Sequence, residues 1–207
     1  MLKYINLARQ FPAYYISLID KQLESFINER EMPICEDVIY ETNEGKSVWK
    51  EARRFLEKQT TLAPFELHDG LNMSARDHAV DLAQHGIFGH AGSDKSTFSE
   101  RILRYCRKGQ GAMAEIIGAD FLIKGRNNPE MTILGLIIDD GVSDRGHRKT
   151  IFNPEYRYIG CKSEVESDKL ITVFNLTENR LEIRGRSSTI TNESLLYGNS
   201  TAPCFRK

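Results

Sequence analysis

The chain has 207 residues and a formal net charge of −1, with 28 lysines and arginines against 29 aspartates and glutamates. This length is enough for one large domain, or for one domain with an extension. A charge balance so close to zero excludes a general attraction to nucleic acid or to anionic membranes. No apolar run could span a bilayer, and the first residues lack the apolar stretch of a signal peptide. We expect a cytosolic chain or a secreted one that has lost its leader.

Amphipathic helices are expected before residue 60. In the first segment Pro12 suits a first helical turn, and an apolar face follows at helical spacing, formed by Tyr15, Leu18, Ile19, Leu23 and Phe26. Met32-Pro33 breaks that pattern. A second helix is predicted over residues 44–59. Residues 1–43 are therefore interpreted as an N-terminal helical extension.

A helix that faces the core is predicted from Asp69 to His85. Its apolar residues recur at i, i+4, i+8 and i+11, at positions Leu71, Ala75, Ala79 and Leu82. His78 and His85 are two turns apart, which is too far for a chelate of the HExxH kind. We interpret both histidines as surface or boundary residues, and Gly86 as the end of the helix.

The remaining elements mix short helices with β-rich runs. A helix is expected to open near Ser96 and to run through Arg107, with a basic, solvated face formed by Arg101, Arg104, Arg107 and Lys108. Residues 112–118 predict a strand, Pro129 begins another helix, and residues 156–161 and 170–176 predict an antiparallel pair. Because strands and helices do not alternate regularly, the fold class is α+β. Residues 177–207 are expected to form a tail that packs on the domain or is partly disordered.

The four cysteines, Cys35, Cys106, Cys161 and Cys204, are widely spaced and form no CxxC motif. This spacing does not favour a zinc knuckle. A chain of this size builds a core without disulfide bonds, so we expect free thiols.

The residues with the most potential for catalysis or metal binding lie in two segments that each place a histidine beside a glycine. One is 89–94, which contains His90, and the other is 146–154, which contains His147. Glu115 lies between them in an apolar frame. Two imidazoles and a carboxylate can bind a divalent metal ion or exchange protons. A histidine hydrogen-bonded to a carboxylate is also a common structural contact, so the residues alone leave both readings open.

Several spaced motifs resemble the CAP superfamily, which comprises cysteine-rich secretory proteins, antigen-five allergens and plant pathogenesis-related proteins. The first motif consists of Leu71, Ala75, His78, Asp81, Gly86, Phe88 and His90. The second is Ala114-Glu115-Ile116-Ile117. The third is Gly146-His147-Arg148-x-x-Ile151-x-Asn153-Pro154-x-Tyr156-x-x-Ile159-Gly160, which is similar to bacterial-type members. The resemblance covers roughly residues 45 to 176, and we place the domain itself at 44–176.

The resemblance implies an α-β-α sandwich, with a small antiparallel sheet between helices and a cleft lined by two histidines and two acids. Carried over by motif, the cleft residues are His90, Glu115, His147 and Asp139, with Asp140 as the competing choice for the last acid. His90, His147 and Glu115 are the expected metal ligands, and Zn²⁺ is the ion that suits them best.

Two functions are compatible with these residues. The resemblance favours a binding module without enzymatic activity, which takes a lipid- or sterol-like molecule or a partner protein. The alternative is a metal-dependent hydrolase, a peptidase, because His₂Glu is also the ligand set of several zinc hydrolases. That reaction needs a separate general base, for which Asp139 or Asp140 is the candidate.

Overall fold

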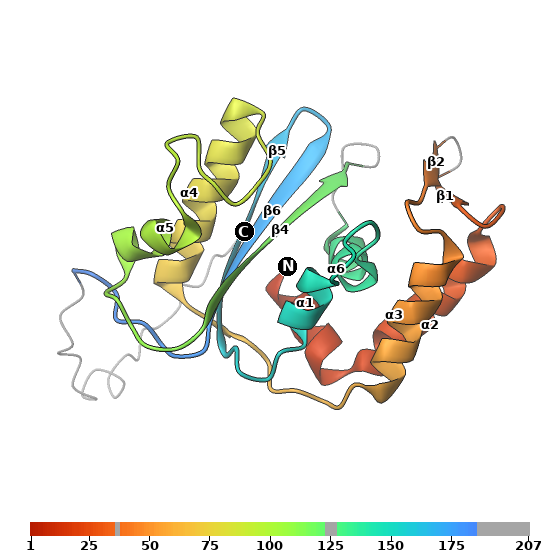
Figure 1. The fold of residues 1–207 in the computed structure, drawn as a ribbon, viewed down its shortest axis with the longest axis horizontal. Coiled ribbons are helices and arrows are strands. Elements are labelled where there is room, and N and C mark those ends of the chain that lie inside the picture. Colours follow the sequence, from red (N-terminus) through yellow and green to blue (C-terminus); the bar gives the residue numbers. More distant parts are fainter. Residues whose placement is uncertain (36–37, 123–127, 186–207) are drawn as a thin grey trace, which may run out of the picture.

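A four-stranded sheet forms the middle layer of the protein, with helices on both faces (Figure 1). The computed structural model describes residues 1–35, 38–122 and 128–185. The strands of this sheet, in spatial order, are β3 (Glu66–Leu67), β5 (Tyr158–Glu166), β6 (Lys169–Thr177) and β4 (Met113–Phe121). The predicted α-β-α sandwich is confirmed.

The sheet is antiparallel except at one edge, where the short β3 runs parallel to β5. The predicted antiparallel pair is confirmed as β5 and β6, but β5 continues to Glu166, beyond the predicted end at Cys161. The polar residues 162–166 belong to the strand because their neighbours on β6 pair with them in unbroken register. Ser167, at φ 58°, lies in the tight turn between the strands.

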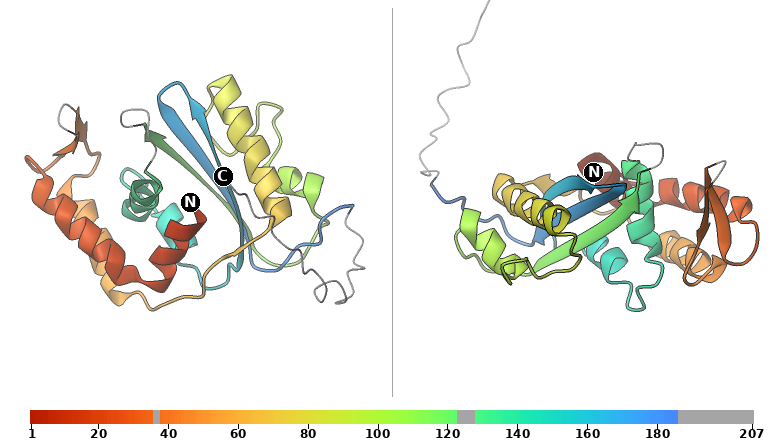
Figure 2. Two further views of the ribbon diagram at one scale, coloured as in Figure 1. Left: turned by 180° about the vertical axis from the view of Figure 1, so that it is seen from behind. Right: turned by 90° about the horizontal axis from the view of Figure 1, so that it is seen from above.

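One face of the sheet is covered by α4 (Asp69–His85) and α5 (Phe98–Tyr105) (Figure 2). The apolar stripe of α4 packs on the sheet in a cluster made of Ala75, Ala79, Leu82, Ile117, Ile171 and Val173. The predicted bounds of α4 are confirmed. Gly86 follows it in the left-handed conformation, at φ 60°, where glycine has no steric penalty.

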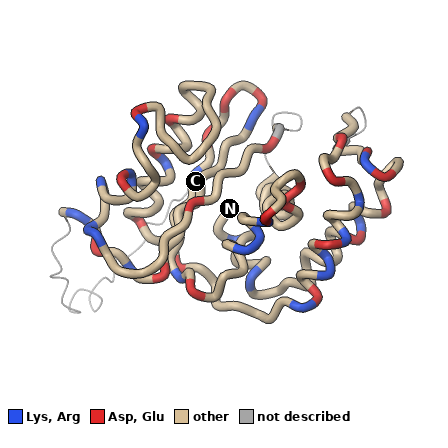
Figure 3. The backbone as a smooth tube through the Cα atoms, viewed as in Figure 1, with Lys and Arg blue, Asp and Glu red and all other residues tan. Residues whose placement is uncertain are grey.

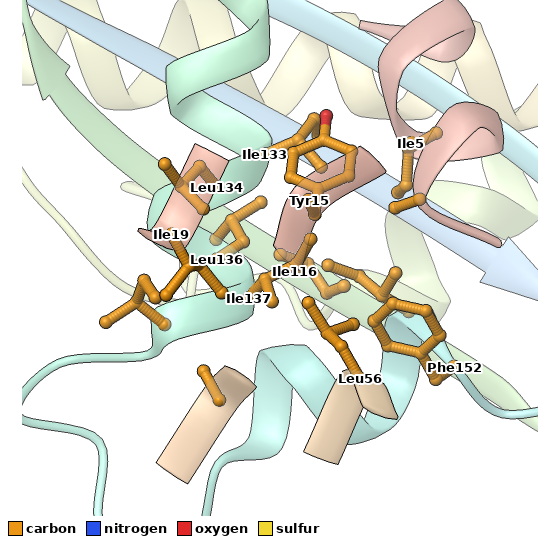
Figure 4. Close-up of a cluster of buried hydrophobic side chains, with 14 of the residues drawn as sticks. Ile5, Tyr15, Ile19, Leu56, Ile116, Ile133, Leu134, Leu136, Ile137 and Phe152 are labelled. Atoms are coloured by element: carbon orange, nitrogen blue, oxygen red, sulfur yellow. The ribbon is translucent and has the colours of Figure 1, made fainter. Parts of the chain in front are cut away.

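In the described parts of the chain, the opposite face carries five helices and the larger core. They are α1 (Leu2–Gln10), α2 (Pro12–Ser25), α3 (Lys46–Lys58), α6 (Pro129–Ile138) and α7 (Gly146–Ile151). Figure 4 shows Tyr15, Ile19 and Leu56 directed toward Ile133 and Ile137 in this core. In the parts of the chain that the structure describes, no helix is both long and apolar enough to cross a membrane.

The two N-terminal helices belong to this core. Ile5 and Tyr15 are fully buried in the same cluster as residues of α3 and α6. Arg9 is buried as well, and its guanidinium donates to the carbonyl oxygens of Ala63, Ile151 and Asn153. This group therefore connects α1 to the end of α7. A division of the chain between residues 43 and 44 remains a prediction.

A second, two-stranded sheet was not expected from the sequence. It consists of β1 (Glu31–Cys35) and β2 (Val38–Glu41), which pair in antiparallel fashion beside α2 and α3 (Figure 1). Met32-Pro33 had been interpreted only as a break after the helix. Proline is compatible with a strand when its nitrogen faces away from the paired neighbour, and that arrangement is not visible in a hydropathy pattern.

The start of the predicted tail lies against the domain. Leu181 is buried beside Leu71, Ile102 and Cys106, and its carbonyl oxygen contacts the buried ring of His68 at 2.8 Å. Residues 186–207 lie outside the described ranges. Of the four cysteines, Cys106 and Cys161 are free thiols, as predicted, while the side chains of Cys35 and Cys204 are not described.

Gly160 is the position where α4 crosses closest to the sheet. A Cβ at this residue would lie 2.1 Å from the backbone nitrogen of Asn72 and 2.1 Å from the carbonyl carbon of Leu71. Both neighbours are backbone atoms, so neither can turn aside. We expect Gly160→Ala to lower the free energy of unfolding by about 1–3 kcal/mol or more. Chemical denaturation measures this change.

Gly135 provides the matched control. It is an exposed residue within α6, and the nearest atom to a Cβ there is 4.0 Å away. Gly135→Ala is expected to raise stability by up to about 1 kcal/mol through helix propensity. Equal effects of the two substitutions would contradict the close approach at Gly160.

Candidate functional site

Glu115 is the buried acid at the centre of the candidate site. Its neighbour Ile116 packs into the core shared with α6, whereas Ile117 packs against α4. Because side chains alternate along a strand, Glu115 faces the layer of α4 and α5. Its side chain is 1% exposed. A carboxylate so buried needs compensating partners to stay ionised.

Arg101 of α5 is the cation that compensates Glu115. Its Nη2 lies 3.0 and 2.9 Å from the two carboxylate oxygens, and this side chain is 2% exposed. The guanidinium also donates to the carbonyl oxygens of Ser96 and His90. The prediction of a solvated basic face is therefore wrong for Arg101. It holds for Arg104, which forms an exposed pair with Asp94.

Arg101 is positioned by the start of α5. Thr97 and Glu100 form a reciprocal capping box, in which each side chain accepts from the backbone N–H of the other residue. The helix begins at Phe98 rather than near Ser96 as predicted, because Thr97 is the capping residue. This start places Arg101 in the first turn, pointing back toward the loop that contains His90.

His90 extends from this buried pair toward solvent. Its Nδ1 lies 2.9 Å from Oε1 of Glu115, and its side chain is 61% exposed. An ionised carboxylate only accepts hydrogen bonds, so Nδ1 carries the proton and donates it. In the described residues Nε2 of His90 has no hydrogen-bond partner.

His78 is a site residue that the sequence analysis misplaced. It was interpreted as a surface or boundary residue, yet it is fully buried. Its Nε2 contacts the carbonyl oxygen of Gly89 at 2.9 Å and lies 3.9 Å from Oε1 of Glu115. Burial is the main cause that lowers the pKa of this imidazole. The available signal was that position 78 lies beside the stripe of Ala75, Ala79 and Leu82.

Asn175 completes the surroundings of Glu115. It lies directly opposite Glu115 in the pairing of β4 and β6. Its amide is oriented with the nitrogen toward Glu115, because this orientation satisfies both ends of the group. The nitrogen then donates to Oε2 at 3.1 Å, and the oxygen accepts from the backbone nitrogen of Ala75 and from Ser74.

His147 and Asp139 form a second pair. Nδ1 of His147 lies 2.7 Å from Oδ1 of Asp139, which ends α6 in the left-handed conformation at φ 60°. Oδ2 of Asp139 accepts from the backbone N–H groups of His147 and Arg148, at 3.0 and 3.2 Å. The competing candidate Asp140 instead accepts from the backbone of residues 43 and 44.

The turn between α6 and α7 is fixed by two arginines. Arg148 is buried and donates to the carbonyl oxygens of Ile137 and Ile138 at the end of α6. Arg145 pairs with Glu44 and Glu51 of the neighbouring segment. The hydrogen bond from Arg145 and a donor from the backbone of residue 141 lower the pKa of Glu44 to about 2. The His147–Asp139 pair therefore stands on an ordered turn.

The sequence-predicted residues form two pairs rather than one cluster. His90–Glu115 belongs to the layer of α4 and α5, and His147–Asp139 belongs to the layer of α6 and α7. The edge strand β4 contacts both α6 and α7. Among the described residues, no group of three or more histidine, cysteine or acidic side chains is arranged to hold a metal ion. Metal binding by His90, Glu115 and His147 thus remains a prediction.

A pocket of about 390 Å³ lies between α4 and residues 93–104, beside Arg101. It shares Arg101 with the site, and its other lining residues are mostly charged or polar: Arg76, Asp77, Val80, Asp81, Gln84, Ser93, Asp94, Ser96 and Arg104. Such a lining suits a polar group better than an acyl chain.

Comparison with protein families identifies the family of this chain. A model named CAP, described as the cysteine-rich secretory protein family, matches residues 2–176. The chain belongs to the CAP family. The match begins well before residue 45, where the motif resemblance started, and so includes the two N-terminal helices.

Solved structures of low similarity were also found. An outer surface protein from Borrelia burgdorferi is 16% identical, with 74% of this chain and 100% of that one covered, at a TM-score of 0.46. An extracellular SCP-domain protein from Bacillus anthracis is 17% identical, with 65% and 40% covered, at 0.40. A cysteine-rich secretory protein from Staphylococcus aureus is 18% identical, with 64% and 37% covered, at 0.38. Curated protein sequences gave no match.

Arg101 is expected to be essential for the stability of this CAP domain. Arg101→Met leaves Glu115 as an uncompensated buried charge, which costs about 3–5 kcal/mol of unfolding free energy. Adding Glu115→Gln should recover part of that loss, because the unpaired charge is removed. Denaturant unfolding of the single and double variants measures the coupling.

Arg104→Met serves as the control for loss of a cation from the same helix. Its pair with Asp94 is exposed, so about 1 kcal/mol at most is expected. A loss at Arg101 no larger than that at Arg104 would show that the buried pair does not form.

His78 is expected to make stability depend on pH. The folded imidazole has a pKa below its ordinary value of 6.5, so the neutral ring favours the folded state. The contribution of the neutral His78 ring to folding stability is fully present above about pH 6.5. It is lost as the pH falls below that value, because the unfolded chain takes up a proton first. His78→Gln should flatten the fall in stability on the acid side of pH 6.5. A profile for His78→Gln that falls as steeply as that of the wild type would refute the assignment.

Proposed function

We propose that this CAP domain is a binding module in which Nε2 of His90 and Nε2 of His147 hold a divalent metal ion, with Zn²⁺ as the best-suited ion. One observation supports the proposal above all. Each histidine donates its Nδ1–H to a carboxylate that other groups hold in place. Such carboxylate–histidine pairs are typical of metal ligands, because they fix the tautomer and direct the other nitrogen outward.

The two carboxylates are well suited to this orienting role. Glu115 accepts hydrogen bonds from Arg101, His90 and Asn175. Asp139 accepts from the ring of His147 and from two backbone nitrogens of α7. A carboxylate that receives several donors has little remaining capacity to bind a metal. We therefore propose Glu115 as an orienting group, in place of the ligand role expected from the motif.

A metal held by two nitrogens has open coordination positions. Water would fill them in the absence of a ligand, and an oxygen or nitrogen donor of a bound molecule would replace that water. Two nitrogens from the protein bind an ion weakly. The ion would then be retained best when a ligand is present, so binding of the ligand would respond to metal.

Both candidates for the general base of the hydrolase alternative are already engaged in hydrogen bonds. Asp139 and Asp140 were the candidates, and both carboxylates already accept from backbone N–H groups. A base must be able to take a proton from water in the site. Neither acid is placed for that task, so a binding role is favoured over peptide hydrolysis.

The class of ligand is inferred from the family resemblance, which implies a lipid- or sterol-like molecule or a partner protein. The charged lining of the cavity beside Arg101 favours the second of these. A polar group of a partner protein can satisfy the side chains there, whereas an acyl chain would leave them without hydrogen bonds.

Calorimetric titration with Zn²⁺ tests the metal proposal. We expect weak binding to the wild-type protein, and none to His90→Ala or His147→Ala, because each removes one of two ligands. Asp139→Asn should retain binding with an affinity about 10–100-fold lower, since it perturbs only the orientation of His147.

His85→Ala is the control for nonspecific binding to imidazole, because His85 is an exposed histidine of α4 outside the site. It should bind Zn²⁺ like the wild type. If His90→Ala and His147→Ala bind as the wild type does, the two-histidine site does not exist.

A further inference from the structure

The β1–β2 hairpin presents an exposed apolar strand away from the main sheet (Figure 2). All four residues of β2 are exposed, and three of them, Val38, Ile39 and Tyr40, are apolar or aromatic. Ile39 is 60% exposed. An exposed strand of β-branched and aromatic residues is a template for pairing with another chain, and proteins usually protect it.

Only the outer edge of β1 is protected against pairing with another strand. Thr42 N–H donates to the carbonyl oxygen of Arg30, so these two residues form a hydrogen-bonded pair. Because hydrogen-bonded and non-hydrogen-bonded pairs alternate along an antiparallel ladder, Pro33 and Ile39 form a pair without mutual hydrogen bonds. The nitrogen of Pro33 therefore faces outward from β1, where it offers no donor. The carbonyl oxygen of Glu31 on the same edge accepts from Ile27 N–H.

The outer edge of β2 is open by the same alternation. The backbone N–H and C=O groups of Ile39 and Glu41 point away from β1. Among the described residues, no backbone hydrogen bond from another element reaches either of them. This edge can therefore accept a further strand.

Two carboxylates beside the outer edge of β2 repel each other, which destabilises the hairpin in the absence of a partner. Glu31 lies directly opposite Glu41 in the ladder. Like charges in this position are destabilising, and in pairs without hydrogen bonds the side chains are closest. Neither carboxylate forms an ion pair within the described parts of the chain. Figure 3 shows that acidic residues occur in the hairpin region.

The hairpin is held firmly on the body of the protein. Met32 is buried in the main core. The carboxylate of Asp140 accepts from the backbone nitrogens of Asn43 and Glu44, just after the hairpin. A partner would therefore meet an edge that is already ordered, which reduces the entropic cost of binding.

We propose that the outer edge of β2 binds an extended, basic segment of a partner protein by strand addition. The backbone of the segment pairs with Ile39 and Glu41, a lysine or arginine neutralises the Glu31–Glu41 pair, and an apolar side chain two residues along covers Ile39. A second copy of this chain would bring further carboxylates together, and an anionic membrane would be repelled. This inference is independent of the metal site.

A short capped peptide of alternating lysine and valine is a suitable probe. Fluorescence anisotropy at low salt should detect its binding, and amide NMR shifts should centre on residues 38–41. Glu31→Gln/Glu41→Gln should weaken binding about tenfold, because charge-assisted contacts are lost. Ile39→Pro should abolish it by removing the outward N–H, as Pro33 does on the other edge.

The control variant Glu66→Gln/Glu155→Gln makes the same change of charge at exposed sites on β3 and in the loop before β5, outside the hairpin. It should bind the probe as the wild type does. If both double variants bind the peptide equally weakly, the effect depends only on net charge, and the proposal is overturned. Absence of binding, equal binding of a glutamate–valine peptide, or dimerisation that Ile39→Pro abolishes would also overturn it.

Discussion

The buried ion pair between Glu115 and Arg101 is the contact on which the candidate site depends. Removing two charges from water costs several kcal/mol for each, so the pair persists only because its geometry and additional hydrogen bonds compensate. Arg101 also binds the carbonyl oxygens of Ser96 and His90. One guanidinium thus connects the edge strand β4 to the loop before α5, and the position of His90 follows from it.

The two histidine–acid pairs differ in how they are supported. Glu115 lies on a strand and is held by side chains from β6 and α5, whereas Asp139 is held mainly by the backbone of α7. The pairs belong to different helical layers, with β4 between them. Binding of one ion by both His90 and His147 therefore depends on how the two helical layers pack on the sheet. Loss of the hydrogen bonds that hold Glu115 or Asp139 would displace one imidazole ring without displacing the other.

The periodicity of apolar residues predicts those helices and strands that pack through an apolar face. The stripe of α4 and the runs of β5 and β6 are apolar on the face that packs, and their existence could be deduced from residue type. Arg101 and His78 could not be placed in this way, because their partner Glu115 is distant in sequence and a buried charge resembles a solvated one in a hydropathy pattern. The pairing of His147 with Asp139 rather than Asp140 depends on a left-handed residue, which no pattern of side chains encodes.

The β1–β2 hairpin is also invisible in the sequence pattern, and the features that hide it concern its proposed binding role. All four residues of β2 are exposed, so the strand lacks the alternation of buried apolar and exposed polar residues that predicts a strand, and proline is read only as a helix breaker. In the structure Pro33 protects the edge of β1, while β2 has no equivalent residue. Since one proline suffices to close an edge, the open edge beside two facing carboxylates is better explained by binding than by stability.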